Sequence, residues 1–329
     1  MISCTFVALV AALAGGSGAK SPSFESVARV AVGRQPKQVA ITPDGRFAWT
    51  TGFGADSISV VDVALRRLVK TFRVPGAPVE LAFSADGKTA FVTSFNPYEL
   101  WFIDTNDYNI TARIKGSLYP KGVAVTPDQK RVYFSNWRDP GLVTVVDVEA
   151  KKVVAKIPVL NRPRGIAISP DGKWAYVCNF GHGGKADGMG LSVIDTATNR
   201  VKKTVRTGFN VRHVALSPDG KRAYASNLGS GTLSVVETAS LKVVRQIRVG
   251  RYPKTVAVSP DGKRVYVANY VSHTVSVIDA ESMLVIETIG GLKKKPSGLA
   301  LSADGETLLV TGWDSNDLHI LRRRTSQAK

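Results

Sequence analysis

Short apolar runs separated by polar turns alternate along the whole chain. Residues 255–289 illustrate the pattern, with four such runs at 255–258, 264–268, 274–278 and 285–289. β-Branched and aromatic residues dominate these runs, and the 3.6-residue apolar period of an amphipathic helix does not occur. The pattern predicts four short strands in this unit and an all-β chain.

A turn of the Ser-Pro-Asp-Gly type recurs once in every such unit. Its aspartates are spaced by 42, 42, 43, 48, 42 and 43 residues, and they are Asp44, Asp86, Asp128, Asp171, Asp219, Asp261 and Asp304. A period in the forties with several strands per repeat is typical of a β-propeller. One such sheet cannot bury both of its faces, whereas seven sheets around an axis bury each face against a neighbour. We therefore predict a seven-bladed β-propeller with four-stranded antiparallel blades.

The two ends of the chain predict how the ring closes. The seventh unit has only three strand-like runs, and its fourth is missing at the C-terminus. The N-terminal segment 24–36, "FESVARVAVGRQP", matches the fourth-strand segment 241–253 of the fifth unit, "LKVVRQIRVGRYP". We expect the N-terminal strand to complete the last blade, within a single propeller domain over residues 20–329 whose repeats span about 24–323.

The first 19 residues contain no charged side chain, and their apolar stretch 6–14 is too short to span a bilayer. Small residues follow this stretch, so we predict a secretory signal peptide over residues 1–19. The mature protein is then periplasmic or secreted and has no membrane span, and we expect it to be monomeric. It retains one cysteine, Cys178, so an internal disulfide is excluded.

The chain is strongly basic, with 44 Lys and Arg against 26 Asp and Glu and a formal net charge of +18. Such an excess favours an acidic protein or a polyanion as partner, although charge also serves solubility alone. A propeller sorts these charges onto two faces. The Pro-Asp-Gly turns lie on the face that we call the bottom, and the loops between blades lie on the top.

Two rings of residues are predicted around the central channel on the top face. Five of the seven residues that open the innermost strands are basic, namely Lys37, Lys121, Arg164, Arg212 and Lys254. Six of the seven residues that follow the second strands are aromatic, namely Phe53, Phe95, Trp137, Phe180, Tyr270 and Trp313. In one interpretation these rings only cap the hydrophobic core. In the other, aromatic stacking beside a basic track binds a polyanion such as single-stranded nucleic acid, or an acidic partner protein.

A channel-mouth enzyme or redox accessory is the alternative function. Its site would combine Glu80, His213 and His182 with the glycine-rich insertion of the fourth repeat, residues 179–193. The four histidines do not follow metal-ligand spacings, and the sequence has no phosphate loop, nucleophile elbow or haem-attachment motif. The favoured interpretation therefore includes no catalytic residue, no metal site and no cofactor.

Four second-strand segments share a motif, "YFSN" at 133–136, "YVCN" at 176–179, "YASN" at 224–227 and "YVAN" at 266–269. Over about residues 24–323 the chain resembles the YVTN-repeat family of seven-bladed propellers, which implies the fold. The resemblance does not settle function, because such propellers include surface-layer proteins, exported scaffolds, a single-stranded-DNA binder and propellers fused to redox or lactonase activities.

From the charge and the two rings we predict an exported, non-enzymatic binding or scaffold propeller. A lactonase-, lyase- or dehydrogenase-associated propeller is the alternative. A structural protein of the cell surface, in which both rings would be idle, is the third hypothesis.

Overall fold

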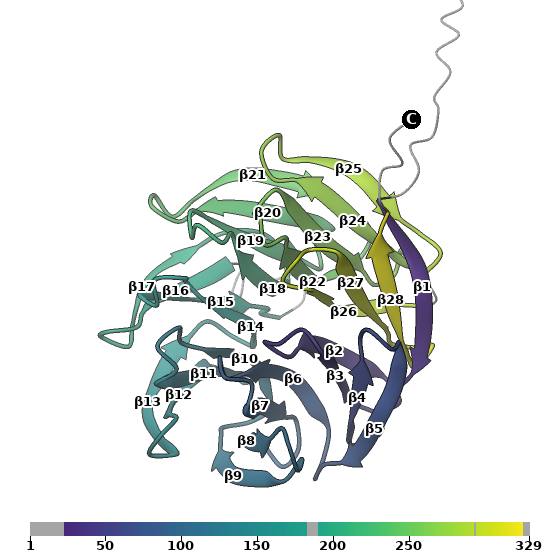
Figure 1. Ribbon diagram of the computed structural model, residues 1–329. Coiled ribbons are helices and arrows are strands. Elements are labelled where there is room, and N and C mark those ends of the chain that lie inside the picture. The colour runs from purple at the N-terminus through teal and green to yellow at the C-terminus, as the bar shows by residue number, and fades with distance from the viewer. Residues whose placement is uncertain (1–22, 183–189, 293, 325–329) are drawn as a thin grey trace, which may run out of the picture.

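The computed structural model describes residues 23–182, 190–292 and 294–324. These residues form seven four-stranded antiparallel sheets, which stand as blades in a ring around a central axis (Figure 1). The predicted seven-bladed, all-β fold is therefore confirmed. Within each blade the strands run in four tiers outward from the axis.

The tiers repeat with nearly constant strand lengths. The innermost strands are β2 (Pro36–Ile41), β6 (Pro78–Phe83), β10 (Pro120–Val125), β14 (Pro163–Ile168), β18 (Val211–Leu216), β22 (Pro253–Val258) and β26 (Pro296–Leu301). The second strands are β3 (Phe47–Gly52), β7 (Thr89–Ser94), β11 (Arg131–Asn136), β15 (Trp174–Asn179), β19 (Arg222–Asn227), β23 (Arg264–Asn269) and β27 (Thr307–Gly312).

The two outer tiers follow the same order. The third strands are β4 (Ser57–Asp62), β8 (Glu99–Asp104), β12 (Gly141–Asp147), β16 (Gly190–Asp195), β20 (Thr232–Glu237), β24 (Thr274–Asp279) and β28 (Asp317–Arg323). The outermost strands are β5 (Arg67–Arg73), β9 (Ile110–Lys115), β13 (Lys152–Val159), β17 (Arg200–Val205), β21 (Lys242–Arg248), β25 (Leu284–Ile289) and β1 (Phe24–Ala31).

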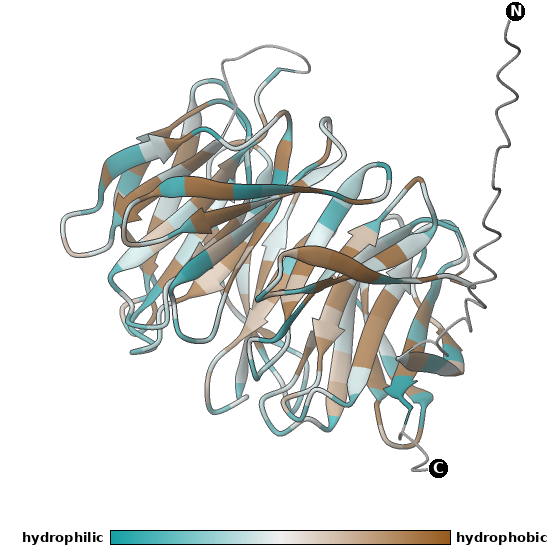
Figure 2. Ribbon diagram, turned by 90° about the horizontal axis from the view of Figure 1, so that it is seen from above, coloured by the Kyte–Doolittle hydropathy of each residue, from teal (hydrophilic) through white to brown (hydrophobic). Residues whose placement is uncertain are grey.

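The hydrophobic core lies between neighbouring blades. Tyr224 and Val235 of the fifth blade, for example, pack with Val256 and Val267 of the sixth, and all four are at least nine-tenths buried. Hydrophobic residues follow the strands, whereas hydrophilic residues gather in the turns of the two faces (Figure 2). The alternation read from the sequence thus places one apolar face of each blade against the next blade.

The ring closes through the first strand, as predicted. β1 pairs antiparallel with β28 and becomes the outermost strand of the seventh blade, where the two lie side by side (Figure 1). Arg29 Nε of β1 donates a 2.9 Å hydrogen bond to Asp317 Oδ2 of β28, and Asp317 is only 4% exposed. The predicted signal peptide, residues 1–19, lies outside the described residues. In the part that the structure describes, no helix has the length and apolar character that crossing a membrane requires.

Every innermost strand begins with an irregularity in its pairing. In the sixth blade Pro253 lies opposite Asn269, but regular pairing resumes only where Val256 faces Val267. The other six blades show the same shift. Such a bulge re-aims the side chains that it contains. It includes Lys254 and the corresponding residue of each blade, which places these side chains at the top of the axis.

Hydroxyl groups join neighbouring innermost strands at this level. Thr93 Oγ1 of the second blade donates to the Lys121 carbonyl of the third at 2.6 Å, and Ser226 Oγ donates to the Lys254 carbonyl at 2.5 Å. In the fourth blade Cys178 holds the equivalent position, fully buried and unbridged. Burial raises the pKa of its thiol well above the ordinary value. Cys178 is therefore an unreactive packing residue.

Candidate functional site

The five predicted cations meet at the top of the ring axis, together with one carboxylate. We call this cluster the axial site and define it by Lys37, Glu80, Lys121, Arg164, Arg212 and Lys254. Lys121 is 3% exposed and Arg212 is 7% exposed, whereas Arg164 and Lys254 are half-buried. The charges of Arg164 and Arg212 act on all three lysines, although the five cations come from five different blades. The strand-opening position therefore converges on one site, as its place in the repeat predicts.

The six predicted aromatic residues surround the axial site, and each is half-buried. The Phe53 ring centroid lies 5.7 Å from that of Phe95 and 5.9 Å from that of Trp313. The Trp137 and Phe180 centroids lie 6.4 Å apart. The Phe53–Phe95 and Trp137–Phe180 contacts are edge-to-face, which is a favourable arrangement for aromatic pairs. The aromatics thus pack against one another from blade to blade.

Cations of the axial site lie between the aromatic rings. Lys121 Nζ is 4.0 Å from the Phe95 centroid and 4.6 Å from that of Trp137. Arg164 Cζ is 4.3 Å from the Trp137 centroid and 4.2 Å from that of Phe180. These ring faces are therefore already covered by cations of the same protein. Each such contact stabilises a charged side chain by about 0.5–2 kcal/mol.

Negative charge in the axial site is scarce. Glu80 is 8% exposed, and its charge favours the protonated forms of Lys37, Lys121 and Arg212. Among the described residues, however, no ion pair joins Glu80 to any of these cations, and Arg164 Nε is buried without a hydrogen-bond partner. When its cations are all protonated, the site has a formal charge of +4.

Burial changes the ionisation of the three lysines. Desolvation, and then the neighbouring cations, lower the pKa of Lys121 to about 3. The same causes lower the pKa of Lys37 and of Lys254 well below the ordinary value. Removing an ammonium group from water costs several kcal/mol, which exceeds the gain from its aromatic contacts. Without an additional anion, the lysines are therefore driven toward their neutral forms.

His213 and Glu80 occupy equivalent positions, one residue after the strand-opening position. His213 is half-buried, and its Nδ1 accepts a 3.4 Å hydrogen bond from the Val256 N–H. Burial lowers the pKa of its imidazole, which is therefore neutral at pH 7. The backbone is crowded at this level, because a Cβ on Gly165 would lie 2.8 Å from His213 Cα, and one on Gly122 would lie 2.4 Å from the Arg164 carbonyl oxygen. Glycine is required at both positions.

His182, the third residue of the alternative site, lies on the top rim. Its Nε2 is 3.0 Å from Asp139 Oδ2, and Arg162 Nε donates to the same oxygen at 3.1 Å. The charge of Glu80 acts on His213, and His182 is not among the groups that shift the His213 pKa. Residues 183–189 of the predicted insertion lie outside the described residues. In the described chain no group of three His, Cys, Asp or Glu side chains could hold a metal ion.

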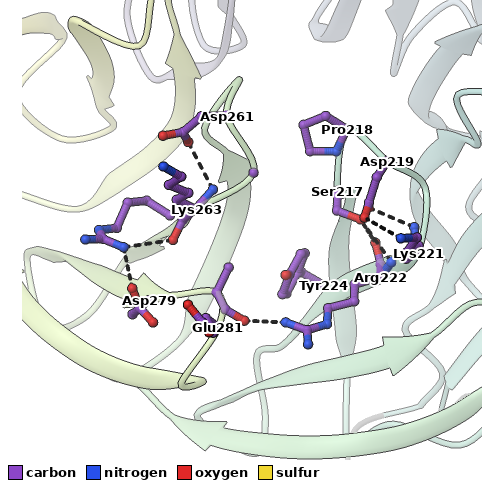
Figure 3. Close-up of a pocket in the computed structure, with 13 residues that line it drawn as sticks. Ser217, Pro218, Asp219, Lys221, Arg222, Tyr224, Asp261, Lys263, Asp279 and Glu281 are labelled. Atoms are coloured by element: carbon purple, nitrogen blue, oxygen red, sulfur yellow. Dashed lines mark hydrogen bonds and ion pairs between the residues drawn. The ribbon is translucent and has the colours of Figure 1, made fainter.

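A pocket of about 660 Å³ lies on the bottom face between the fifth and sixth blades (Figure 3). Its walls mix both signs of charge, including Asp219, Arg222, Asp279 and Glu281, and Arg222 donates a hydrogen bond to the Ala280 carbonyl. A similar crevice lies between the fourth and fifth blades. These pockets were not predicted from the sequence. The repeated Pro-Asp-Gly turns that line them were the available signal. The charge of the larger pocket is balanced and does not select a ligand.

Comparison with known proteins supports the same architecture. A family model described as a lactonase, seven-bladed β-propeller, matches residues 25–183, and one described as a cytochrome D1 heme domain matches residues 185–297. The chain is a seven-bladed propeller. Among solved structures, hydrazine synthase of Kuenenia stuttgartiensis is similar with 21% identity and a TM-score of 0.80, over 89% of this chain and 96% of the other.

No curated protein matches the chain. The two family models agree with the YVTN resemblance at the level of a seven-bladed propeller, but neither names that repeat. Their descriptions are closer to the alternative function, a redox- or enzyme-associated propeller, than to a polyanion binder. The residues matched by the cytochrome D1 model include Arg212, His213 and Lys254.

Proposed function

We propose that this protein is a redox- or enzyme-associated propeller that binds an anionic ligand in its axial site. The observation that carries the proposal is the set of five buried or half-buried cations around a single carboxylate, with no ion pair to Glu80 among the described residues. We also propose that residues 1–19 direct export and that residues 20–329 form the mature single-domain propeller.

The axial site lacks negative charge to balance its cations. A buried cation without a partner destabilises the folded state by several kcal/mol. Natural sequences tolerate such a cost mainly at functional sites, where a ligand supplies the opposite charge. An anion at the top of the axis would offer this charge to several blades at once.

The arrangement of the aromatics supports a compact ligand over a nucleic acid strand. Single-strand binders stack successive bases on accessible ring faces. In the axial site Lys121 and Arg164 lie over the faces of Phe95, Trp137 and Phe180. A base would first have to displace these cations, whereas a small anion could reach them between the rings.

Thermal unfolding with a panel of anions tests the proposal. A ligand present at 100 times its Kd stabilises the folded state by about 2.7 kcal/mol. We expect citrate or pyrophosphate to raise the Tm of the wild type and of the exposed-lysine control Lys221→Met. The same ligands should not change the Tm of the Arg212→Met protein. Equal shifts in all three proteins would contradict the proposal, and a larger shift with a 12-nucleotide single-stranded DNA would favour the strand-binding hypothesis.

Catalysis on the bound anion is a second candidate function, favoured by the pairing of Glu80 with a neutral His213 near the cations. A neutral imidazole can accept a proton from water. The lactonase match suggests a probe, a lactone that carries a carboxylate group. Hydrolysis by the wild type and its loss in His213→Asn, with anion binding retained, would support this activity. Equal hydrolysis by both proteins would exclude it.

A further inference from the structure

The axial site contains two kinds of cation that respond differently to burial. Burial lowers the pKa of Arg164 and of Arg212. A guanidinium nevertheless stays charged at neutral pH, because its ordinary pKa lies so far above it. An ammonium group can lose its proton when it is desolvated, which makes Lys37, Lys121 and Lys254 the variable charges of the site. The formal net charge of the axial site can therefore range from about +1 to +4, depending on how many of its three lysines are protonated.

The charged groups facing these lysines come from every surrounding blade. Lys37 faces Arg164, Arg212, Lys121 and Glu80. Lys254 faces both arginines and Lys37, and also Lys295, whose Nζ is already 2.9 Å from Asp314 Oδ2. Tyr270 also faces Lys254, whose Nζ lies 3.3 Å from its ring centroid. Glu80 is the carboxylate that acts on Lys37 and Lys121, whereas Asp314 is already paired with Lys295. A bound anion would therefore be the principal counter-charge for the lysines.

The size of the ligand follows from the crowding of the site. Gly122 and Gly165 bring neighbouring backbones together beside it, and the half-buried aromatics surround it. Lys121 Nζ and Arg164 Cζ lie 4.6 Å and 4.3 Å from the same Trp137 ring centroid. Lys37 Nζ lies 4.7 Å from the Phe53 centroid, which is 5.7 Å from the Phe95 ring that Lys121 also covers, so these cationic groups lie within a short range of one another. A ligand that contacts most of them must be compact and carry several charges.

We infer that the axial site binds a compact anion carrying three or four negative charges, an oligocarboxylate or a short polyphosphate, and that its lysines take up protons as the anion binds. This inference rests on the proposed function and names its ligand class. Each negative charge of the ligand favours the ammonium form of a lysine over the amine, since opposite charge stabilises the charged state. Proton uptake also implies that affinity falls as pH rises.

Isothermal titration calorimetry at about pH 8 tests both the ligand class and the uptake of protons on binding. Citrate, succinate and acetate are titrated into the mature protein in buffers that differ in ionisation enthalpy, so that the heat reports protons exchanged. At this pH the citrate carboxyl groups are already ionised and cannot supply the protons. We expect citrate to bind at least about tenfold more tightly than succinate, with uptake of about one proton or more per citrate. Lys121→Met should reduce this uptake, and Lys221→Met should not.

A parallel titration with pyrophosphate distinguishes phosphate from carboxylate ligands, and tight binding of either supports the inference. If neither citrate nor pyrophosphate binds more tightly than acetate, the ligand class is overturned. Tight citrate binding without proton uptake would overturn the role of the lysines while leaving the proposed function intact. If none of the anions binds, the proposed function fails, and this inference fails with it.

Discussion

Replacing Lys121 with methionine should make the ligand-free protein more stable. Lys121 is 3% exposed and lies between the rings of Phe95 and Trp137. The methionine side chain has a similar length and packs well against aromatic rings. It has no amino group to desolvate. The substitution therefore removes the charge problem of this position while keeping most of its contacts.

The size of the effect follows from the pKa of Lys121, which burial lowers from 10.5 to about 3. At pH 7 the unfolded chain carries this proton and the folded chain does not. Each pKa unit corresponds to about 1.4 kcal/mol, so releasing the proton on folding costs about 4–5 kcal/mol. Allowing for imperfect repacking, we expect Lys121→Met to raise the free energy of unfolding by about 2–4 kcal/mol.

Urea unfolding at pH 7, in a chloride buffer without multivalent anions, measures this difference. The control is Lys221→Met, because the Lys221 side chain is 82% exposed and its loss should change stability by less than about 0.5 kcal/mol. A Lys121→Met protein that is less stable than the wild type by 1 kcal/mol or more, with the control unchanged, would refute the reasoning. It would mean that the ammonium group is a net stabilising element of the aromatic ring.

The free energy of unfolding of the ligand-free protein should rise between about pH 7 and 10, because burial depresses the lysine pKa values and the unfolded chain binds more protons. Urea titrations at a series of pH values measure this slope. Asp317→Asn should lower the Tm, since the amide loses the ion pair with Arg29 that closes the ring, at a cost of about 1–3 kcal/mol. Gly122→Ala should also destabilise the protein by about 1–3 kcal/mol and abolish the citrate response, because the new Cβ would lie 2.4 Å from the Arg164 carbonyl oxygen.

A different result would contradict each of these three expectations. Stability that is flat or falls from pH 7 to 10 would mean that the axial lysines keep their protons. Asp317 is held ionised, with its pKa below the ordinary value, by His319, Ser315 and Arg29. Its contribution is therefore present above about pH 4 and is lost as pH falls further. An Asp317→Asn protein with the wild-type Tm at pH 7 would show that closure does not depend on this pair. A stable Gly122→Ala protein with normal citrate binding would show that the backbone there has room to move.

The fold and the place of the axial site could be predicted from the sequence because both are properties of the repeat. The period fixes seven blades, and a position within the repeat fixes a tier and a face. Lys37 and Lys254 therefore converge although 217 positions separate them in the chain. The closing strand was predictable for the same reason, since the segment that begins at Phe24 matches a fourth strand.

The contacts within the site could not be predicted in this way. Whether Lys121 lies beside Trp137 or between Trp137 and Phe95 depends on the bulge in the innermost strand and on packing across a blade boundary. Neither of these leaves a recognisable pattern in the amino-acid sequence. The same limit applies to His182. Its position in the insertion suggested the channel, but the structure pairs it with Asp139 on the rim. The burial of these side chains could not be predicted from the sequence, and it turns a predicted basic surface into a cluster of cations that have no ion-pair partner among the described residues.

A crystal structure grown with selenate would test the central claim most directly, because selenium scatters anomalously and marks the bound anion. The account predicts the strongest anomalous peak at the top of the axis, within hydrogen-bond distance of Arg212 and of at least one of Lys37, Lys121 and Lys254. It also predicts that this peak disappears in Arg212→Met crystals. Anomalous peaks confined to exposed lysines of the outer strands and the bottom turns, with none on the axis, would contradict the claim that this propeller binds an anion at its centre.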